Sequence, residues 1–217
     1  MLNLFAVRSC KSKLDLGFAI DGCGTDSFSS CTELIKSIIK KVDVSSGETR
    51  VGIILYSRRA ELLFGFGDLT NLSQISNALN NISYKLKKHR SLLNIGAALE
   101  MARQKLFTET RPGTKQVLIL VTGGKAKDDV VIPSSQLRKD GVKLYAVGVG
   151  GLFDQGQLDV ISSNPIYNYK LTSDSPSILD LTRSVRSDLC EGKKIFTSLL
   201  NSLYSKHLNI HNRCHYT

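Results

Sequence analysis

The chain has 217 residues, of which 41% are hydrophobic and 22% charged, and its formal net charge is +10. This length suits one domain of ordinary size with a short extension, and the composition excludes a disordered chain. No apolar run approaches the roughly 20 residues of a membrane-spanning helix. The positive charge favours acidic partners, but no nucleic-acid motif accompanies it, and aromatic residues do not alternate with the basic ones. We therefore expect a globular domain that binds no nucleic acid.

The first half of the chain alternates between apolar runs and helical patterns. Leu16–Ile20 is a short apolar run that ends in Asp21 and several small residues, which is typical of a buried parallel strand. Arg50–Ser57 predicts a second buried strand. Ala60–Phe64 predicts an antiparallel edge strand, because only a few residues separate it from its neighbour. Two helices are predicted from apolar residues at helical spacing, namely Leu34, Ile35, Ile38, Ile39 and Val42, and then Leu72, Ile75, Leu79 and Ile82.

The second half of the chain continues the alternation. Asn94 is placed to cap a helix that carries Ile95, Ala98, Leu99, Ala102 and Leu106, and Gln116–Thr122 is the strongest buried strand of the sequence. Further elements are predicted as a helix that ends near Gly141, a strand at Val142–Val149, a helix at Gly156–Ser163, a strand at Ile166–Leu171 and a helix from Ser175. The pattern predicts an α/β fold, with a doubly wound, mostly parallel sheet, one antiparallel edge strand and helices on both faces.

The five cysteines include no closely spaced pair, so we do not predict a structural zinc site. Cys10 precedes the first predicted strand and Cys190 follows the last predicted helix. A disulfide between them would close a long loop and stabilise the fold by ~4–5 kcal/mol in the chain-entropy model. The alternative is two unrelated free thiols.

Residues 191–217 differ in character from the rest of the chain. They begin with the pattern of a short amphipathic helix, and His207, His211 and His215 then recur every four residues, with Cys214 nearby. These side chains could bind a metal ion if the segment were helical. The interpretation that we favour is a solvated tail or a linker towards another domain.

Several segments resemble one family, the von Willebrand factor type A domain, especially the versions in collagens and matrilins. They are residues 14–25 (LDLGFAIDGCGT), 50–57 (RVGIILYS), 94–102 (NIGAALEMA) and 116–151, of which the last is the most specific. The resemblance covers residues 12–190 and implies a Rossmann-like sheet with a metal-ion-dependent adhesion site on its upper rim. In that family an Asp-x-Ser-x-Ser loop, a threonine and a second aspartate surround Mg²⁺ or Mn²⁺, which are hard cations that prefer oxygen ligands.

The first of these three loops keeps part of the family's pattern. Asp21 matches the first aspartate, and Thr25 keeps a hydroxyl in place of the second serine. Cys23 stands in place of the first serine, and a thiol is a poor, soft ligand for Mg²⁺. The resemblance therefore assigns Asp21 and Thr25 as candidate metal ligands. The alternative for Asp21 is a structural role, accepting hydrogen bonds from the loop of small residues that follows it.

The other two loops depart further from the pattern. Counting back three residues from Gly96 places Leu93 at the threonine position, whereas counting back five places Ser91 there, and both registers stay open. In the third loop Gly123 stands where the family carries its second aspartate. With Ser91 as the third candidate ligand, we expect a degenerate site, no cofactor, and Mg²⁺ or Mn²⁺ as the ions that an intact site would hold.

Basic residues lie in or next to the two loops that have lost oxygen ligands. In this fold they should reach the same rim, where they could bind a sulfated or carboxylated ligand directly, without a bridging metal. The candidate residues of this basic rim are Lys87, Lys88, Arg90, Lys125 and Lys127. The alternative is an ordinary solvated charge run.

These observations predict a non-catalytic adhesion or interaction domain of an extracellular matrix or cell-surface protein. We expect it to be a fragment of a longer secreted chain without its signal peptide, because residues 1–7 are too short for a signal core. Its expected partners are matrix proteins such as collagens, sister domains of the same family, or glycosaminoglycan. One alternative is a structural assembly domain of a larger matrix chain with no separate ligand. A cytosolic enzyme is the least favoured, since a nucleophile elbow, a complete phosphate loop and an acid–base pair are all missing.

Overall fold

The computed structural model describes residues 13–22, 25–82, 92–109, 111–164 and 168–171. The strands are β1 (Leu14–Asp21), β2 (Thr49–Tyr56), β3 (Ala60–Phe64), β4 (Lys115–Gly124), β5 (Lys143–Leu152) and β6 (Asn168–Leu171). The helices are α1 (Thr25–Ile39), α2 (Leu72–Ile82), α3 (Ile95–Met101), η1 (Ala102–Leu106), α4 (Val131–Lys139) and α5 (Gln155–Ile161). The helix expected from Ser175 and the pair Cys10 and Cys190 lie outside the described residues.

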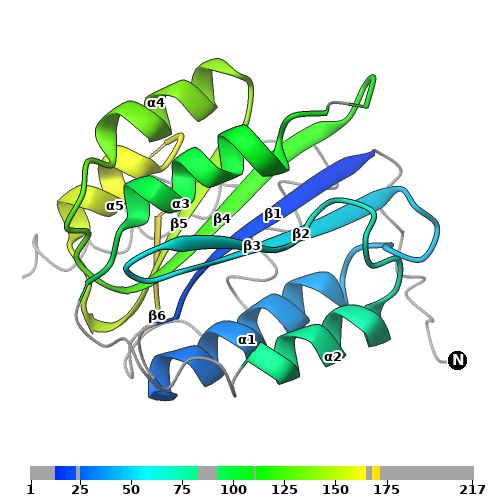
Figure 1. Cartoon of the computed structure of the whole chain (residues 1–217), viewed down its shortest axis with the longest axis horizontal. Coiled ribbons are helices and arrows are strands. Elements are labelled where there is room, and N and C mark those ends of the chain that lie inside the picture. The colour runs from blue at the N-terminus through cyan, green and yellow to red at the C-terminus, as the bar shows by residue number, and fades with distance from the viewer. Residues whose placement is uncertain (1–12, 23–24, 83–91, 110, 165–167, 172–217) are drawn as a thin grey trace, which may run out of the picture.

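The strands form a single sheet in the order β3-β2-β1-β4-β5-β6 (Figure 1). β3 is antiparallel to β2, and the other neighbours are parallel. The chain leaves β1 to build β2 and β3 on one side and later returns to build β4 on the other. The point between β1 and β4 is therefore the topological switch point, where open α/β sheets place their ligands beyond the carboxyl ends of the strands. The predicted doubly wound sheet with one antiparallel edge strand is confirmed.

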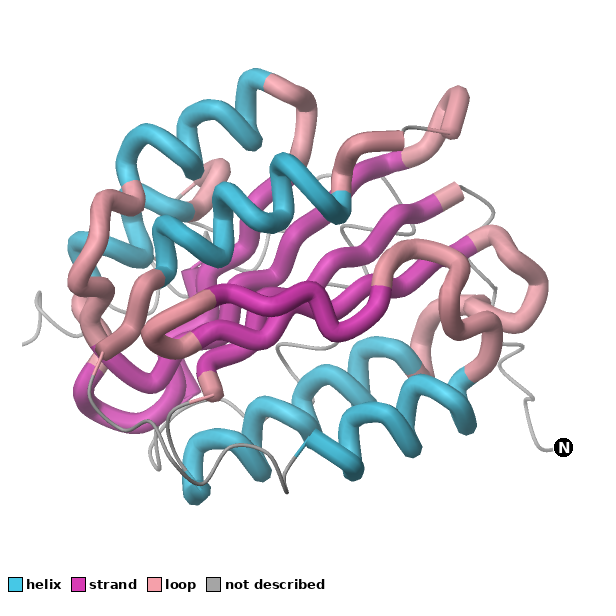
Figure 2. The backbone as a smooth tube through the Cα atoms, in the orientation of Figure 1, coloured by secondary structure: helices cyan, strands magenta, loops and turns pink. Residues whose placement is uncertain are grey.

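Helices cover both faces of the sheet (Figures 1 and 2), with α1 and α2 on one face and α3, α4 and α5 on the other. Side chains alternate along each strand, so Phe18 and Ile20 pack in the core under α1 and α2, whereas Ala19 belongs to the core under α3 to α5. Because both faces are covered, the middle parts of the central strands are continuous apolar runs instead of alternating with polar residues. This explains why β1 and β4 are such clear apolar runs in the sequence.

The helix predicted through Leu106 changes its winding after Met101. Residues 102–106 form a π-turn, η1, in which the backbone N–H of Phe107 donates to the carbonyl of Ala102. The wider turn places Leu106 over the sheet at two glycines. A Cβ on Gly17 would lie 2.8 Å from Leu106 Cδ2, and one on Gly52 would overlap Leu106 Cδ1. The two glycines therefore give η1 the room to lie close to β1 and β2.

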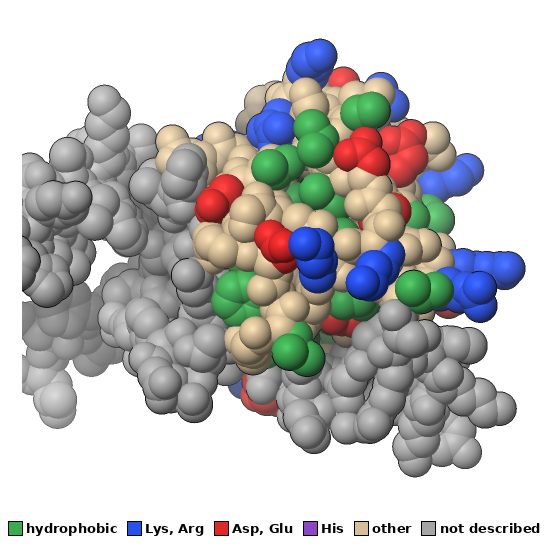
Figure 3. Space-filling view, turned by 90° about the vertical axis from the view of Figure 1, so that its left-hand side faces the viewer, with side chains coloured by type: hydrophobic (Ala, Val, Ile, Leu, Met, Phe, Trp, Pro, Cys, Tyr) green, Lys and Arg blue, Asp and Glu red, His purple; other side chains and the backbone are tan. Residues whose placement is uncertain are grey.

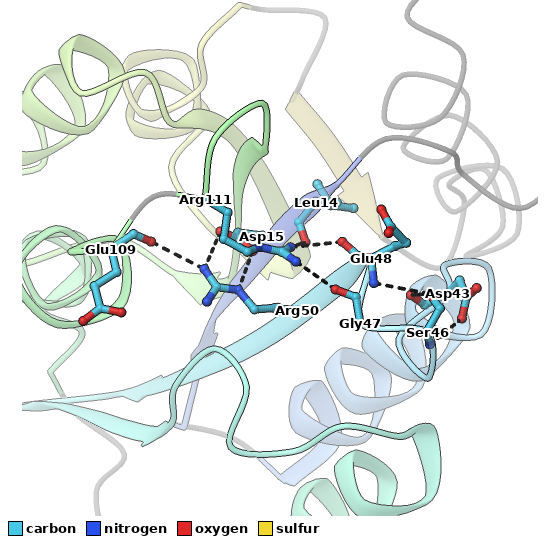
Figure 4. A network of polar contacts seen from close by, with 9 residues as sticks. All are labelled: Leu14, Asp15, Asp43, Ser46, Gly47, Glu48, Arg50, Glu109 and Arg111. Carbon is cyan, nitrogen blue, oxygen red and sulfur yellow. Dashed lines mark hydrogen bonds and ion pairs between the residues drawn. The ribbon is translucent and has the colours of Figure 1, made fainter.

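A buried carboxylate organises the opposite end of the sheet, where the parallel strands begin (Figure 4). Asp15 is fully buried, and it accepts hydrogen bonds from Arg50 Nε and Nη2, each at 2.8 Å. Arg111 Nη2 donates to the same carboxylate at 2.8 Å. Arg111 also donates to the carbonyl oxygens of Gly47, Leu14 and Glu48. These contacts compensate the charge of Asp15 inside the sheet. β1 begins at Leu14, two residues before the predicted strand, because Leu14 and Asp15 already pair with β2 and β4.

Candidate functional site

The candidate site lies at the edge where the parallel strands end. Asp21, the last residue of β1, is 5% exposed, and its Oδ2 accepts a hydrogen bond from the backbone N–H of Gly123 at 2.9 Å. The backbone N–H of Gly22 donates to the carbonyl of Tyr56 at 2.7 Å, and the Tyr56 hydroxyl donates to the carbonyl of Val121. The ends of β1, β2 and β4 are thus fastened to one another, with the Asp21 carboxylate at the switch point.

Cys31 of α1 is a buried free thiol close to this carboxylate. Burial, and secondly the negative charge of Asp21, raise the pKa of Cys31 to about 12. Both effects disfavour a thiolate. Cys31 is therefore a core residue that stays protonated, and it supplies no nucleophile to the rim.

The loop before α3 is held by contacts other than the predicted cap. Asn94 occupies the N-cap position of α3, but its side chain makes no capping hydrogen bond, which corrects the expectation from the sequence. Its Nδ2 donates instead to the carbonyl of Arg58 at 3.0 Å, and its backbone N–H donates to Ser57. These hydrogen bonds of Asn94 therefore connect the loop before α3 to the turn between β2 and β3.

Asp128, from the loop between β4 and α4, takes the capping role. Its carboxylate oxygens accept hydrogen bonds from the backbone N–H groups of Gly96 at 2.9 Å and Ala97 at 2.8 Å. A carboxylate at this position suits the partial positive charge of a helix N-terminus. A Cβ on Gly96 would overlap the carbonyl oxygen of Asp129, so glycine is what allows the two loops to approach so closely. Nothing in the sequence predicts that Asp128 contacts Gly96.

The same loop is fastened on its other side to the start of α5. Lys125 Nζ lies 2.8 Å from Asp154 Oδ2, and Asp154 Oδ1 accepts from the backbone N–H of Gln157 as the N-cap of α5. The hydrogen bond from Lys125, and secondly that from Gln157, lower the pKa of Asp154. The side-chain amide of Gln157 bonds to both the N–H and the carbonyl of Ala126. The loop between β4 and α4 is therefore fixed from two directions.

The rim positions that the structure describes do not fit a magnesium site. Gly123 offers no side chain, and Leu93 is apolar and packs against Gly124, where a Cβ would lie 2.8 Å from Leu93 Cδ1. One oxygen of Asp21 is already engaged by Gly123. A hard cation needs several oxygen ligands, and these residues supply too few. Among the residues with described positions, no group of three His, Cys, Asp or Glu side chains is arranged to hold a metal ion.

The structure covers only part of the predicted site. Ser91 and three of the basic-rim candidates, Lys87, Lys88 and Arg90, lie outside the described residues, and Thr25 is the first residue of α1. Lys125 and Lys127 both lie in the loop after β4 and are exposed. On the edge that faces the viewer in Figure 3, Lys and Arg side chains are interspersed with acidic and hydrophobic ones. The described part of this edge is thus mixed in character, and one of its two predicted lysines is paired.

The model of the von Willebrand factor type A domain family matches residues 15–184, and the chain belongs to this family, as the sequence predicted. Human vitrin is 31% identical over 175 residues, which cover 79% of this chain and 25% of vitrin. Human matrilin-1 is 30% identical over 186 residues, which cover 82% of this chain and 36% of matrilin-1. The chain therefore spans about a quarter to a third of the length of these relatives.

A solved structure shares the fold closely. Proximal thread matrix protein 1 from the mussel byssus, in a form with a zinc-occupied metal-ion-dependent adhesion site, superimposes with a TM-score of 0.72 at 25% identity. The superposition covers 84% of this chain and 47% of the mussel protein. A member of this fold can thus hold a metal at that site. In the described part of the present chain, no helix is long and apolar enough to cross a membrane.

Proposed function

We propose that this chain is a non-catalytic adhesion or interaction domain of an extracellular matrix or cell-surface protein, and that its rim binds partners without a bridging metal ion. Its relatives include a matrilin, and the mussel neighbour is named as a matrix protein. The hydrogen bond from the Gly123 backbone to Asp21 is the observation that carries the proposal. It gives the site carboxylate a structural partner inside the protein.

The metal-ion-dependent adhesion site is, in this proposal, degenerate. In the family the ion is surrounded by side chains from three loops. Here the third loop offers Gly123 in place of the aspartate, and the second loop offers either Leu93 or Ser91 at the threonine position. The positions of these loops are supported by Asp128, Gln157 and the pair of Lys125 with Asp154. Loops that are fixed by direct hydrogen bonds do not need an ion to hold them together. The described part of the rim, the loop after β4 and the start of α3, is therefore preorganised, which lowers the entropic cost of binding a partner.

The proposed ligands are acidic groups of matrix proteins, such as collagens or sister domains, and of glycosaminoglycans. Lys127 is exposed and supports this role, because a charged hydrogen bond to a carboxylate or sulfate is stronger than a neutral one. The positive charge of Lys125 is partly compensated by Asp154, since Lys125 Nζ lies 2.8 Å from Asp154 Oδ2. Lys87, Lys88 and Arg90 complete the proposed basic rim from the sequence that precedes the second loop.

Binding of the full chain to immobilised heparin and to collagen tests the proposal, in Mg²⁺, in Mn²⁺ and in a chelator. We expect equal binding in all three, a decrease with added salt, and a further decrease in Lys127→Glu. Lys139→Glu is the matched control, because this lysine is also exposed and lies at the far end of α4. Binding that disappears in the chelator would overturn the metal-free mechanism. Equal binding by the two lysine variants would exclude a role for Lys127.

A structural assembly role is the second candidate, and exposed aliphatic side chains favour it. Val131 and Ile132, at the start of α4, are 55% and 62% exposed, and Leu152, at the end of β5, is 82% exposed. Such side chains suit contact with a sister domain more than contact with an acidic glycan. Sedimentation of the wild-type chain and of Leu152→Ser compares the two roles. Self-association that the variant weakens would favour assembly, and a monomer at all concentrations would count against it.

A further inference from the structure

Two Asn-x-Ser sequences fall at opposite ends of α2. One is Asn71-Leu72-Ser73, at the start of the helix. The other is Asn81-Ile82-Ser83, of which Asn81 and Ile82 are the last two residues of the helix and Ser83 lies outside the described residues. Asn-x-Ser is the acceptor sequence for N-linked glycosylation in secreted proteins. We propose that Asn81 is an N-glycosylation site. This inference rests on the extracellular location in the proposed function.

The position of Asn81 on α2 makes it a suitable carrier of a glycan. Ile75, Leu79 and Ile82 form the buried face of the helix, whereas Asn81 is exposed in its last turn. No hydrogen bond holds the Asn81 carboxamide within the described part of the chain. Its neighbour Asn80 is different, since Asn80 Oδ1 accepts from Lys36 Nζ at 2.9 Å. A bulky substituent on Asn81 can therefore extend into solvent without breaking a contact with the described residues.

Asn71 provides an internal comparison, because its carboxamide already has a structural role. Asn71 is half-buried, and its Oδ1 accepts from the backbone N–H of Gln74 at 2.9 Å. Gln74 Oε1 in turn accepts from the backbone N–H of Thr70 at 2.9 Å. The bond to Asn71 caps the start of α2, and the bond from Thr70 fastens the residue before the cap to the same turn. A glycan on Asn71 would have to leave through Nδ2 while Oδ1 kept the cap, so we expect lower occupancy at Asn71 than at Asn81.

The surface around Asn81 is also suited to a glycan. α2 reads LSQISNALNNI and contains no charged residue, although the whole chain carries a net charge of +10. Its exposed side chains are neutral and polar, namely Ser73, Gln74, Asn77, Asn80 and Asn81. α2 lies beside α1, on the face opposite α3, α4 and α5 (Figure 1). A glycan here would cover the α2 face and leave the face formed by α3 to α5 free for protein contacts.

The chemistry requires a co-substrate of one class, an oligosaccharide linked to a lipid through a diphosphate. Nδ2 of Asn81 forms a bond to the anomeric carbon of the first sugar. The bond between that carbon and the diphosphate oxygen breaks, and the lipid diphosphate leaves with the electron pair. Nδ2 loses one proton, so the product is a neutral secondary amide and no oxidant or reductant is needed.

The test expresses the full chain in mammalian cells, behind a heterologous signal peptide and with a reporter glycosylation sequence added after Thr217. Only molecules that carry the reporter glycan are scored, in the lysate and in the medium, so every scored chain has reached the lumen. Peptides are treated with peptide N-glycosidase in ¹⁸O-water, which converts a glycan-bearing asparagine into labelled aspartate. We expect labelled residue 81 in the wild type. Asn81→Gln and Ser83→Ala should each remove one glycan from the intact protein, whereas Asn71→Gln should have a smaller effect or none.

An unlabelled residue 81 in reporter-positive wild-type chains would overturn the inference, whatever is found at Asn71. That result would leave the proposed rim function untouched, because heparin and collagen binding are measured separately. Conversely, a labelled Asn81 in a chain that binds neither ligand would contradict the rim function alone. Loss of a glycan in Ser83→Ala is informative even if Asn81→Gln folds poorly, because the serine variant keeps the asparagine.

Discussion

The Asp21 carboxylate and the Gly123 backbone N–H meet across the switch point of the sheet, with 2.9 Å between Oδ2 and N. One residue ends β1 and the other lies near the end of β4, so this single hydrogen bond joins two neighbouring strands at the candidate site. A backbone N–H is present where the resemblance implies a second carboxylate. Adding that carboxylate is therefore the most direct way to ask what the site has lost.

We expect Gly123→Asp to bind Mn²⁺ measurably in calorimetry, and the wild-type chain to bind it far more weakly or not at all. The new carboxylate would supply a second hard oxygen ligand and one more negative charge beside Asp21. Gly123 is not among the glycines with positive φ, so an aspartate is compatible with the backbone. Gly123→Asn is the control, because it has the same shape without the charge. Tight Mn²⁺ binding by the wild-type chain would show that the site is intact.

Asp15→Asn should lower the free energy of unfolding by about 3 kcal/mol, since removing one partner of a buried ion pair leaves the other charges uncompensated. Arg50 and Arg111 both donate to this carboxylate, and Asp15 is fully buried. Urea unfolding measures the change. The matched control is Asp140→Asn, which breaks an exposed pair with Arg103 and should cost less than about 1 kcal/mol. An equal decrease in the free energy of unfolding in the two variants would mean that the buried ion pairs of Asp15 stabilise the fold no more than an exposed pair.

Gly96→Ala should lower the free energy of unfolding by about 2–3 kcal/mol, the upper part of the usual range of about 1–3 kcal/mol for overpacking. Its new Cβ would overlap the carbonyl oxygen of Asp129, and backbone atoms cannot move aside as easily as a flexible side chain. Gly151→Ala is the control, because a Cβ there meets no atom within 4 Å. Thermal or urea unfolding compares the two. A stable Gly96→Ala variant would show that the loop after β4 is not clamped to α3.

The Asp154 carboxyl group should titrate below its ordinary pKa of 3.8 in the folded chain, as followed by its ¹³C resonance in NMR. A carboxyl group with a depressed folded-state pKa stabilises the fold above its unfolded pKa, and this contribution is lost as the pH falls through the folded value. Acid should therefore weaken the contact of Lys125 with Asp154. Lys125→Met should raise the pKa towards 3.8 but not fully, because the hydrogen bond from Gln157 remains. No change in Lys125→Met would show that the pair does not form in solution.

Most of the fold was predictable because both faces of the sheet are buried. A strand buried on both sides reads as an apolar run, so β2, β4 and β5 were visible without any structure. The short connection to Ala60–Phe64 also required an antiparallel partner, as found. The π-turn at η1 was not predictable, because Ala102 and Leu106 have the same spacing in a regular helix. The turn brings Leu106 close to Gly17 and Gly52, which belong to other elements, and this contact leaves no mark in the local sequence.

The candidate site was less predictable, because its contacts join residues that are far apart in the sequence. The sequence pointed to Asp21 and to the loss of an aspartate at Gly123, since both follow clear strands. It gave no sign that Asp128 would cap α3 in place of Asn94, or that Asp154 would pair with Lys125. Each of these acidic residues follows a strand in a polar loop and looks like ordinary solvated surface. Only the arrangement of the strands decides which loops meet.

The position of β1 between two parallel neighbours has a mechanical consequence. Residues 14–20 pair simultaneously with β2 and with β4, and the chain enters β1 at Leu14. A pulling force that reaches this strand along its length acts on both ladders in shear, so their hydrogen bonds share the tension instead of opening one after another. Arg111 adds a further attachment at the point where the force enters, through Leu14 and Asp15. The fold should therefore resist extension most strongly along its central strand.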